Sequence, residues 1–205
     1  VDSILSQTYQ KFDIFEVNYG NEDTSILSEK KFTQNHYFFK RDFSDHTEAM
    51  TFLLNKCFLE YDIDVVFNTN LDDYYHLTRF EKQISVFEKN NILLCSSNWN
   101  YIENNRITRR NFLKRRTTPE VCILKKILKK NIVNHSGIAF RKEFWFTRDR
   151  YDNFLRYRNE IPEEDFKLWK RCISDNVYVG ILSQPLIFYR IHPNQTGLMK
   201  KRDVQ

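Results

Sequence analysis

Apolar positions along the chain follow two alternating patterns. Short, largely apolar segments such as residues 12–17 and 64–68 are typical of strands in a sheet, whereas Ala49, Leu53 and Cys57 recur at the spacing of one helix face. The patterns predict strands over residues 12–17, 36–40, 64–68, 92–97, 132–141, 177–179 and 185–191, and helices over residues 1–7, 24–31, 45–60, 77–89, 119–130 and 162–173.

Two of the predicted helices begin with a local signal. Asp45 and Glu48 have the spacing of a capping box, in which the two side chains satisfy backbone N–H groups of the first turn. Pro162 stands where proline is favoured, at the first position of a helix.

The alternation of strands and helices predicts an α/β fold in which a mixed, mostly parallel sheet is flanked by helices. Ligands of such sheets bind beyond the carboxyl ends of the strands. Asn18, Asp72 and Asp73 fall at such ends. No internal repeat or linker is visible, so residues 1–205 are interpreted as a single domain. Because the chain starts inside a predicted helix, we expect a further segment upstream of Val1.

Composition narrows the class of protein. A chain of 205 residues can bury a core without disulfides, and its 18 Phe, 11 Tyr and 3 Trp supply large apolar areas. Its cysteines are Cys57, Cys95, Cys122 and Cys172, whose wide spacing predicts separate reduced thiols rather than a zinc site. No stretch has the length of a membrane span and no signal peptide is visible, so we expect a cytoplasmic location or the cytosolic face of a membrane.

Basic residues are concentrated in one segment, residues 106–116, and Lys125, Lys126, Lys129 and Lys130 add a basic face to a predicted helix. Such a cluster can bind a polyanion, but it is also typical of a solvated loop. The segment contains one aromatic residue, too few for a platform that stacks nucleic-acid bases, and we expect no nucleic-acid partner.

Three groups of polar residues could carry chemistry. Residues 70–73 follow a buried strand with an acidic pair that could hold a hard cation, although Asn and Asp also favour turns. Glu164 and Asp165 lie at a helix start, where they could stabilise the helix dipole or act as a general base. His192, after the last strand, could be a surface residue or a metal ligand.

Five segments occur in the order found in a known family. Residues 3–9, S-I-L-S-Q-T-Y, are similar to its opening S-I-L-x-Q-T-Y, and residues 18–23 stand where it has D-D-G-S-x-D. Residues 70–79 resemble D-x-D-D-x-x-x-P-x-R, with leucine in place of the proline. Residues 164–169 resemble E-D-x-x-L-W, and residues 185–192 resemble P-L-x-x-Y-R-x-H. Across nearly its whole length the chain therefore resembles the family 2 glycosyltransferases.

The resemblance implies a GT-A fold whose first strand has no counterpart in this sequence. It also implies a nucleotide-diphosphate sugar donor, for which we expect a UDP-sugar, and a Mn²⁺ or Mg²⁺ ion. The acceptor would be a glycan, a protein or a lipid-linked molecule, and the anomeric carbon would be inverted in one displacement.

Carried over by position, the resemblance assigns the chemistry to two pairs of residues. Asp72 would bind the metal, with His192 as a further ligand. Asp165 would be the base that deprotonates the acceptor hydroxyl, with Glu164 beside it.

The donor site of the resemblance comprises four further positions. Asn18 would face the nucleoside and Asn70 the ribose, while Asp73 and His135 would belong to the donor pocket. The family has aspartate where this chain has Asn18 and Asn70; the amide keeps the shape and a hydrogen-bonding oxygen but loses the charge.

Two functions from different classes stay open on this basis. The first is an active, metal-dependent inverting glycosyltransferase. The second is a catalytically degenerate domain that binds a nucleotide or glycan without transferring sugar, which the two asparagines favour.

Overall fold

The structure is a computed structural model that describes residues 1–18, 25–104, 106–110, 120–126, 129–158 and 163–192. Its strands are β1 (Ile14–Asn18), β2 (His36–Lys40), β3 (Val65–Phe67), β4 (Tyr74–Tyr75), β5 (Leu94–Glu103), β6 (Arg106–Arg110), β7 (Val121–Leu124), β8 (Ala139–Arg141) and β9 (Val179–Arg190). Its helices are α1 (Asp2–Leu5), α2 (His46–Asn55), α3 (Arg79–Lys89), α4 (Lys142–Phe146) and α5 (Glu164–Ser174), with a π-helical segment at Lys56–Glu60 and a 3₁₀ turn at His135–Gly137.

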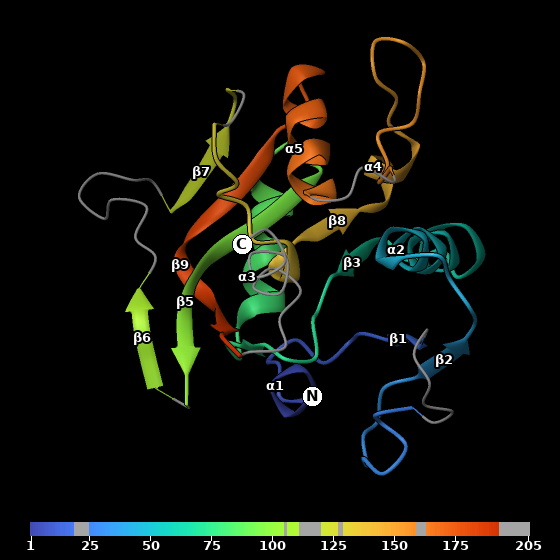
Figure 1. Cartoon of the computed structure of the whole chain (residues 1–205), viewed down its shortest axis with the longest axis vertical. Coiled ribbons are helices and arrows are strands. Elements are labelled where there is room, and N and C mark those ends of the chain that lie inside the picture. Colours follow the sequence, from blue (N-terminus) through green and yellow to red (C-terminus); the bar gives the residue numbers. More distant parts are fainter. Residues whose placement is uncertain (19–24, 105, 111–119, 127–128, 159–162, 193–205) are drawn as a thin grey trace, which may run out of the picture.

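The strands form two sheets (Figure 1). The larger sheet has the order β3-β8-β5-β9-β4, with β6 added to β5 and β7 added to β9, while β1 and β2 pair with each other. The two longest pairings, β5 with β9 and β1 with β2, are parallel, and the shorter ones are antiparallel. The predicted α/β fold with a mixed sheet is confirmed.

Both faces of the larger sheet are covered by helices. Successive side chains of a strand point to opposite faces, so Leu94 and Ile181 enter one core cluster while Cys95 and Leu182 enter another. The first cluster includes apolar residues of α2, α4 and α5, and the second includes those of α3. The alternation along β5 and β9 thus decides which helix covers which face.

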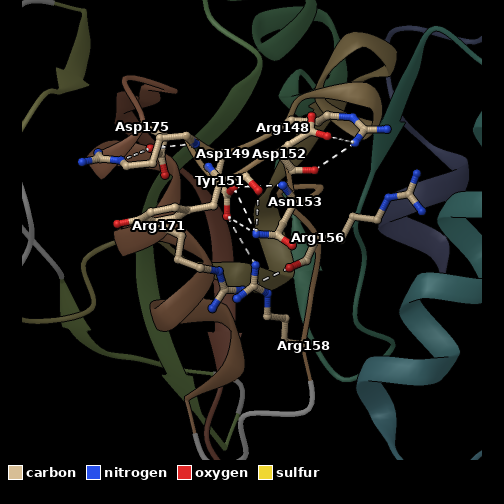
Figure 2. A network of polar contacts seen from close by, with 10 residues as sticks. Arg148, Asp149, Tyr151, Asp152, Asn153, Arg156, Arg158, Arg171 and Asp175 are labelled. Atoms are coloured by element: carbon tan, nitrogen blue, oxygen red, sulfur yellow. Dashed lines mark hydrogen bonds and ion pairs between the residues drawn. The ribbon is translucent and has the colours of Figure 1, made fainter.

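A polar network between residues 147–158 and α5 holds that helix from its C-terminal half (Figure 2). The guanidinium of Arg150 donates to the carboxylate of Asp175 at 2.6 Å, and Arg171 of α5 donates to the backbone oxygen of Arg156 at 3.1 Å. The side chain of Asp149 accepts two backbone N–H groups of its own loop. The network orients α5, whose opposite end carries Glu164.

The helix predicted over residues 24–31 is wrong. Residues 26–29 form a turn instead, and residues 19–24 lie outside the described part of the chain. The carboxylate of Glu16 accepts hydrogen bonds from the Ser25 hydroxyl at 2.5 Å and from the backbone N–H of Ile26 at 3.1 Å. These contacts fold the segment against β1, which local spacing could not indicate.

The helix predicted over residues 119–130 is also wrong, and so is its basic lysine face. Its apolar centre is β7, whose Val121 and Leu124 lie opposite Leu182 and Val179 of β9 in an antiparallel pair. Pairing with a buried strand therefore outweighs the helical spacing of this segment. Residues 111–119 and 127–128, which hold much of the basic region, lie outside the described residues, but the first part of residues 106–116 is the edge strand β6.

Three further predictions needed smaller corrections. The strand predicted over residues 132–141 is limited to β8, because a 3₁₀ turn precedes it, and the two last predicted strands are one continuous β9. α5 begins at Glu164, and Pro162 lies outside the described residues. The predicted cap by Asp45 is confirmed, since its side chain accepts the backbone N–H of Glu48 at 2.9 Å. The Glu48 carboxylate accepts the backbone N–H of Ser44 at 2.8 Å, one residue before the position that a capping box uses.

The four cysteines form no disulfide, as predicted. Of the helices in the described part of the chain, none has the length and apolarity that crossing a bilayer requires. β1 and β3 both contribute to a cavity of about 790 Å³ that lies between the two sheets.

We expect Gly137→Ala to destabilise the fold by about 1–3 kcal/mol, the usual effect of overpacking a core. An added Cβ would stand 1.9 Å from Cδ1 and 2.6 Å from Cγ1 of Ile187, which is fully buried. Chemical denaturation of Gly137→Ala, of Ile187→Val and of the double variant measures the loss. The smaller valine should recover part of the loss, and simple additivity would contradict the clash.

Candidate functional site

The acidic loop after β3 is joined to the end of β9 by a buried carboxylate. Oδ1 of Asp73 accepts the backbone N–H of Arg190 at 2.9 Å, and Asp73 is 2% exposed. Two residues beyond Arg190, Nε2 of His192 lies 3.0 Å from Oδ2 of Asp72. The structure therefore brings together the two residues predicted to bind a metal, which are 120 positions apart.

The same loop is supported from the opposite side by a tyrosine and an arginine. The hydroxyl of Tyr75 accepts the backbone N–H of Asn70 at 2.7 Å and shares its proton between the carbonyl oxygens of Asn70 and Ser136, at 3.1 and 3.2 Å. Arg79 lies over the Tyr75 ring, 4.5 Å from its centroid, and donates to the backbone oxygen of Asn68 at 2.8 Å. The loop backbone is thus fixed by the fold itself.

Sequence reasoning included Arg79 only as a letter of a motif and missed Tyr75. Arg79 is fully buried, and burial lowers its pKa to about 10. A buried guanidinium needs acceptors, and here they are a backbone oxygen and the amide oxygen of Gln83 at 2.9 Å. The one available sequence signal was the tyrosine pair directly after the acidic residues.

A cavity of about 740 Å³ lies next to this loop. Its walls come from α1, β1, the turn at residues 26–27, the acidic loop, the first eight residues of α2 and Glu164 at the start of α5. The polar side chains in this lining include Glu16, His46, Thr47, Asn70, Asp72 and Glu164. The cavity of about 790 Å³ between the sheets is lined by none of the predicted site residues. We therefore assign the site to the cavity of about 740 Å³.

Five predicted site residues are outside that lining. One of them is His192, which lies 3.0 Å from the lining residue Asp72. Asn18 ends β1, one position beyond the lining residue Val17. Asp73 is buried as the clamp to β9, where desolvation raises its pKa to about 6. His135 and Asp165 stand beside the lining rather than in it, and their predicted roles stay predictions.

Two imidazoles lie in contact at the side of the cavity nearest α5. The rings of His46 and His135 meet edge to face, with centroids 5.9 Å apart, and Nε2 of His135 is 2.7 Å from the hydroxyl of Tyr157. Burial lowers the pKa of both histidines, and the carboxylates of Glu164 and Asp165 only partly oppose this effect. Both rings are therefore neutral at pH 7.

The start of α5 directs its two carboxylates differently. Glu163, before the helix, has a left-handed backbone with φ of 75°, an unfavourable conformation for a side chain of this type. Glu164 then lines the cavity, while Oδ2 of Asp165 accepts a hydrogen bond from the side-chain amide of Asn131 at 2.9 Å. The predicted base thus has an orienting partner, and its neighbour faces the cavity.

Asp72 and His192 could supply two of the ligands of a bound cation. One carboxylate and one imidazole suit an ion that takes its remaining ligands from phosphate and water, as Mg²⁺ commonly does. The described residues contain no group of three or more His, Cys, Asp or Glu side chains placed to hold a metal, so a bound ion would depend on the ligand.

Comparison with known proteins tests this assignment. No family model matches the chain. It is 25% identical over 207 residues to the Escherichia coli O-antigen biosynthesis glycosyltransferase WbnJ, covering 96% of this chain and 74% of that protein.

Solved structures give a fold-level match. The structure of S. aureus TarS 1–349 has a TM-score of 0.65 at 13% identity, covering 92% of this chain. The structure of the same protein in complex with UDP-GlcNAc has a TM-score of 0.67 at 12% identity, covering 95%. This chain spans about half the length of those TarS chains, 55% and 54%.

The mixed sheet is covered by helices on both faces, and polar loops and helix starts line one cavity beside it. Together with the likeness to TarS, this arrangement defines a GT-A type fold. In its motifs the chain resembles glycosyltransferases, and over 96% of its length it is similar to the glycosyltransferase WbnJ.

We expect Asp73→Asn to remove a pH-dependent loss of stability. The unfolded carboxyl ionises near pH 4 and the folded one near pH 6. Unfolding therefore releases a proton between these values, and wild-type stability falls as pH rises through the window, by on the order of 3 kcal/mol, then stays level. Denaturation at pH 4, 5, 6 and 7 in EDTA measures it.

Asparagine cannot ionise but can still accept from the N–H of Arg190. The free energy of unfolding of the variant should therefore rise relative to that of the wild type as pH increases from 4 to 6. A constant difference would show that Asp73 titrates as an ordinary carboxyl.

Proposed function

We propose that this domain transfers a sugar from a UDP-sugar to an acceptor hydroxyl, with inversion at the anomeric carbon. The observation that carries the proposal is the pair of Asp72 and His192, 3.0 Å apart, beside a cavity of about 740 Å³ that Asn70 and Glu164 also line. A cavity of this size suits a ligand as large as a nucleotide sugar. WbnJ is an O-antigen biosynthesis glycosyltransferase, and TarS structures contain UDP or UDP-GlcNAc, which supports this donor class.

The donor would lie between β1 and the acidic loop. The β1 side of the cavity offers Ile14, Phe15 and Val17 for apolar contact with a nucleoside. The Asn70 amide can donate to or accept from a ribose hydroxyl, and Asn18 could act in the same way on the nucleoside. The backbone of Asn70 is already held by Tyr75, so binding would require little reorganisation there.

The diphosphate would lie near Asp72. A Mn²⁺ or Mg²⁺ ion held by Asp72 and His192 would neutralise the charge that develops on the departing diphosphate. His192 suits this place because it lies beside a carboxylate and can bind a cation as the neutral imidazole.

The reaction needs a base, for which we propose Asp165. Its carboxylate would accept the proton of the acceptor hydroxyl as that oxygen bonds to the anomeric carbon and the bond from that carbon to the diphosphate oxygen breaks. The hydrogen bond from Asn131 orients the carboxylate. Glu164, in the cavity lining, would position the acceptor or the sugar.

A second candidate function is nucleotide or glycan binding without transfer. It is favoured by Asn18 and Asn70, which lack the charge of the family's aspartates. This candidate shares donor binding with the first and differs in predicting no product.

We expect UDP to bind in a metal-dependent manner. Calorimetric titration of UDP, GDP and dTDP, first with Mn²⁺ and then with EDTA, measures the affinity of each. Asp72→Asn should weaken UDP binding in Mn²⁺ by roughly 10- to 100-fold, the range for losing a contact to a charged group. Asp152→Asn, an exposed carboxylate of the loop at 147–158, is the matched control and should bind as the wild type does.

Equal binding with Mn²⁺ and EDTA would contradict the metal site. Binding of none of the three nucleotides by the folded protein would contradict the donor class.

We expect Asp165→Asn to lower sugar transfer by about 10²–10⁴-fold, the usual contribution of a general base, with UDP affinity unchanged. Release of UDP in the presence of acceptor measures turnover. Glu163→Gln, the exposed neighbour before α5, serves as the control and should keep wild-type turnover. If Glu164→Gln loses transfer while Asp165→Asn retains it, the base is Glu164. No transfer by the wild type, with nucleotide bound, would favour the binding function.

A further inference from the structure

The first turn of α2 places two polar side chains in the lining of the 740 Å³ cavity, and no motif identified them. They are His46 and Thr47, the first two residues of this ten-residue helix. The N-cap Asp45 accepts the backbone N–H of Glu48, so the turn is held in place without either side chain. The cap therefore does not use the Thr47 hydroxyl.

Thr47 carries the clearest sign of an absent partner. The residue is 5% exposed, and its hydroxyl has no hydrogen-bond partner among the described residues. A buried hydroxyl without a partner costs about 1–3 kcal/mol, and native proteins keep few of them. Because Thr47 lines the cavity, a ligand in that cavity can supply the missing hydrogen bond.

The charges around this turn indicate what kind of ligand group fits. His46 lies in the field of three carboxylates, those of Asp45, Glu164 and Asp165, and burial lowers the pKa of its ring so that it is neutral at pH 7. Negative charges nearby disfavour a diphosphate at this position. Uncharged hydroxyl groups, which donate and accept, match a neutral imidazole and a threonine hydroxyl.

The position of the turn agrees with that choice. The His46 ring contacts His135, which is bonded to Tyr157, and Glu164 of α5 lines the same cavity. The turn thus lies on the side where the carboxylates of α5 begin, where the transferred sugar must be if one of them is the base.

We propose that the first turn of α2 binds the hydroxyl groups of the transferred sugar, with the Thr47 hydroxyl as one hydrogen-bond partner and the His46 imidazole as another. The inference rests on the proposed function and adds the residues that distinguish a nucleotide sugar from its nucleotide.

Thr47→Val is the test, because valine has nearly the shape of threonine without the hydroxyl. The control is Thr51→Val, on the same helix and outside the cavity lining. Calorimetry measures the affinity of wild type and both variants for UDP and for UDP-GlcNAc, UDP-glucose and UDP-galactose. The comparison uses the sugar nucleotide that the wild type binds most tightly.

We expect Thr47→Val to weaken the UDP-sugar roughly 5- to 10-fold, the worth of one hydrogen bond, and to change the affinity for UDP by less than about twofold. Its unfolding midpoint should equal or exceed that of the wild type, because the variant removes an unpaired buried hydroxyl. Thr51→Val should leave both affinities unchanged.

Equal weakening of UDP and UDP-sugar by Thr47→Val, or no weakening of either, would overturn the inference while leaving the proposed function intact. A wild type that binds UDP-sugars no more tightly than UDP would overturn it as well. Failure of the wild type to bind UDP would instead overturn the proposed function, and this inference with it.

Discussion

A buried carboxylate joins the two parts of the site, and the other site features depend on it. Asp73, directly before β4, accepts the backbone N–H of Arg190 at the end of the neighbouring strand β9. That contact aligns the acidic loop with the chain segment after β9, and so sets Asp72 beside His192. Desolvation raises the Asp73 pKa to about 6, so ionisation of this buried carboxyl lowers the stability of the fold at neutral pH, although the hydrogen bond from Arg190 opposes the effect. Such local costs are common where a structure holds a functional geometry.

The larger sheet supplies the rigid frame for this clamp. Alternate side chains of β5 and β9 pack under different helices, so the positions of α3 and α5 are fixed from opposite faces. The polar network of residues 147–158 then holds the C-terminal half of α5 (Figure 2). Glu164, at the other end of α5, consequently reaches the cavity from a packed helix rather than from a free loop.

The asparagines that replace family aspartates affect charge more than geometry. The backbone of Asn70 is held by Tyr75 through its N–H and carbonyl, contacts that do not involve the side chain. Asp72, for which we propose a role in binding a cation, lies beside His192. The balance between catalysis and binding alone therefore depends chiefly on the α5 carboxylates, which keep the family pattern.

The sequence by itself determined the α/β class, β2 at His36–Lys40, the capped start of α2 and the pairing partners Asp72 and His192, through local signals and ordered motifs. Only the tertiary structure decided that β7 is a strand and that Thr47 lines the cavity. Local periodicity records which residues share a face, but not what that face meets. Pairing with β9 and burial beside other elements are long-range energies, and they outweigh weak local preferences.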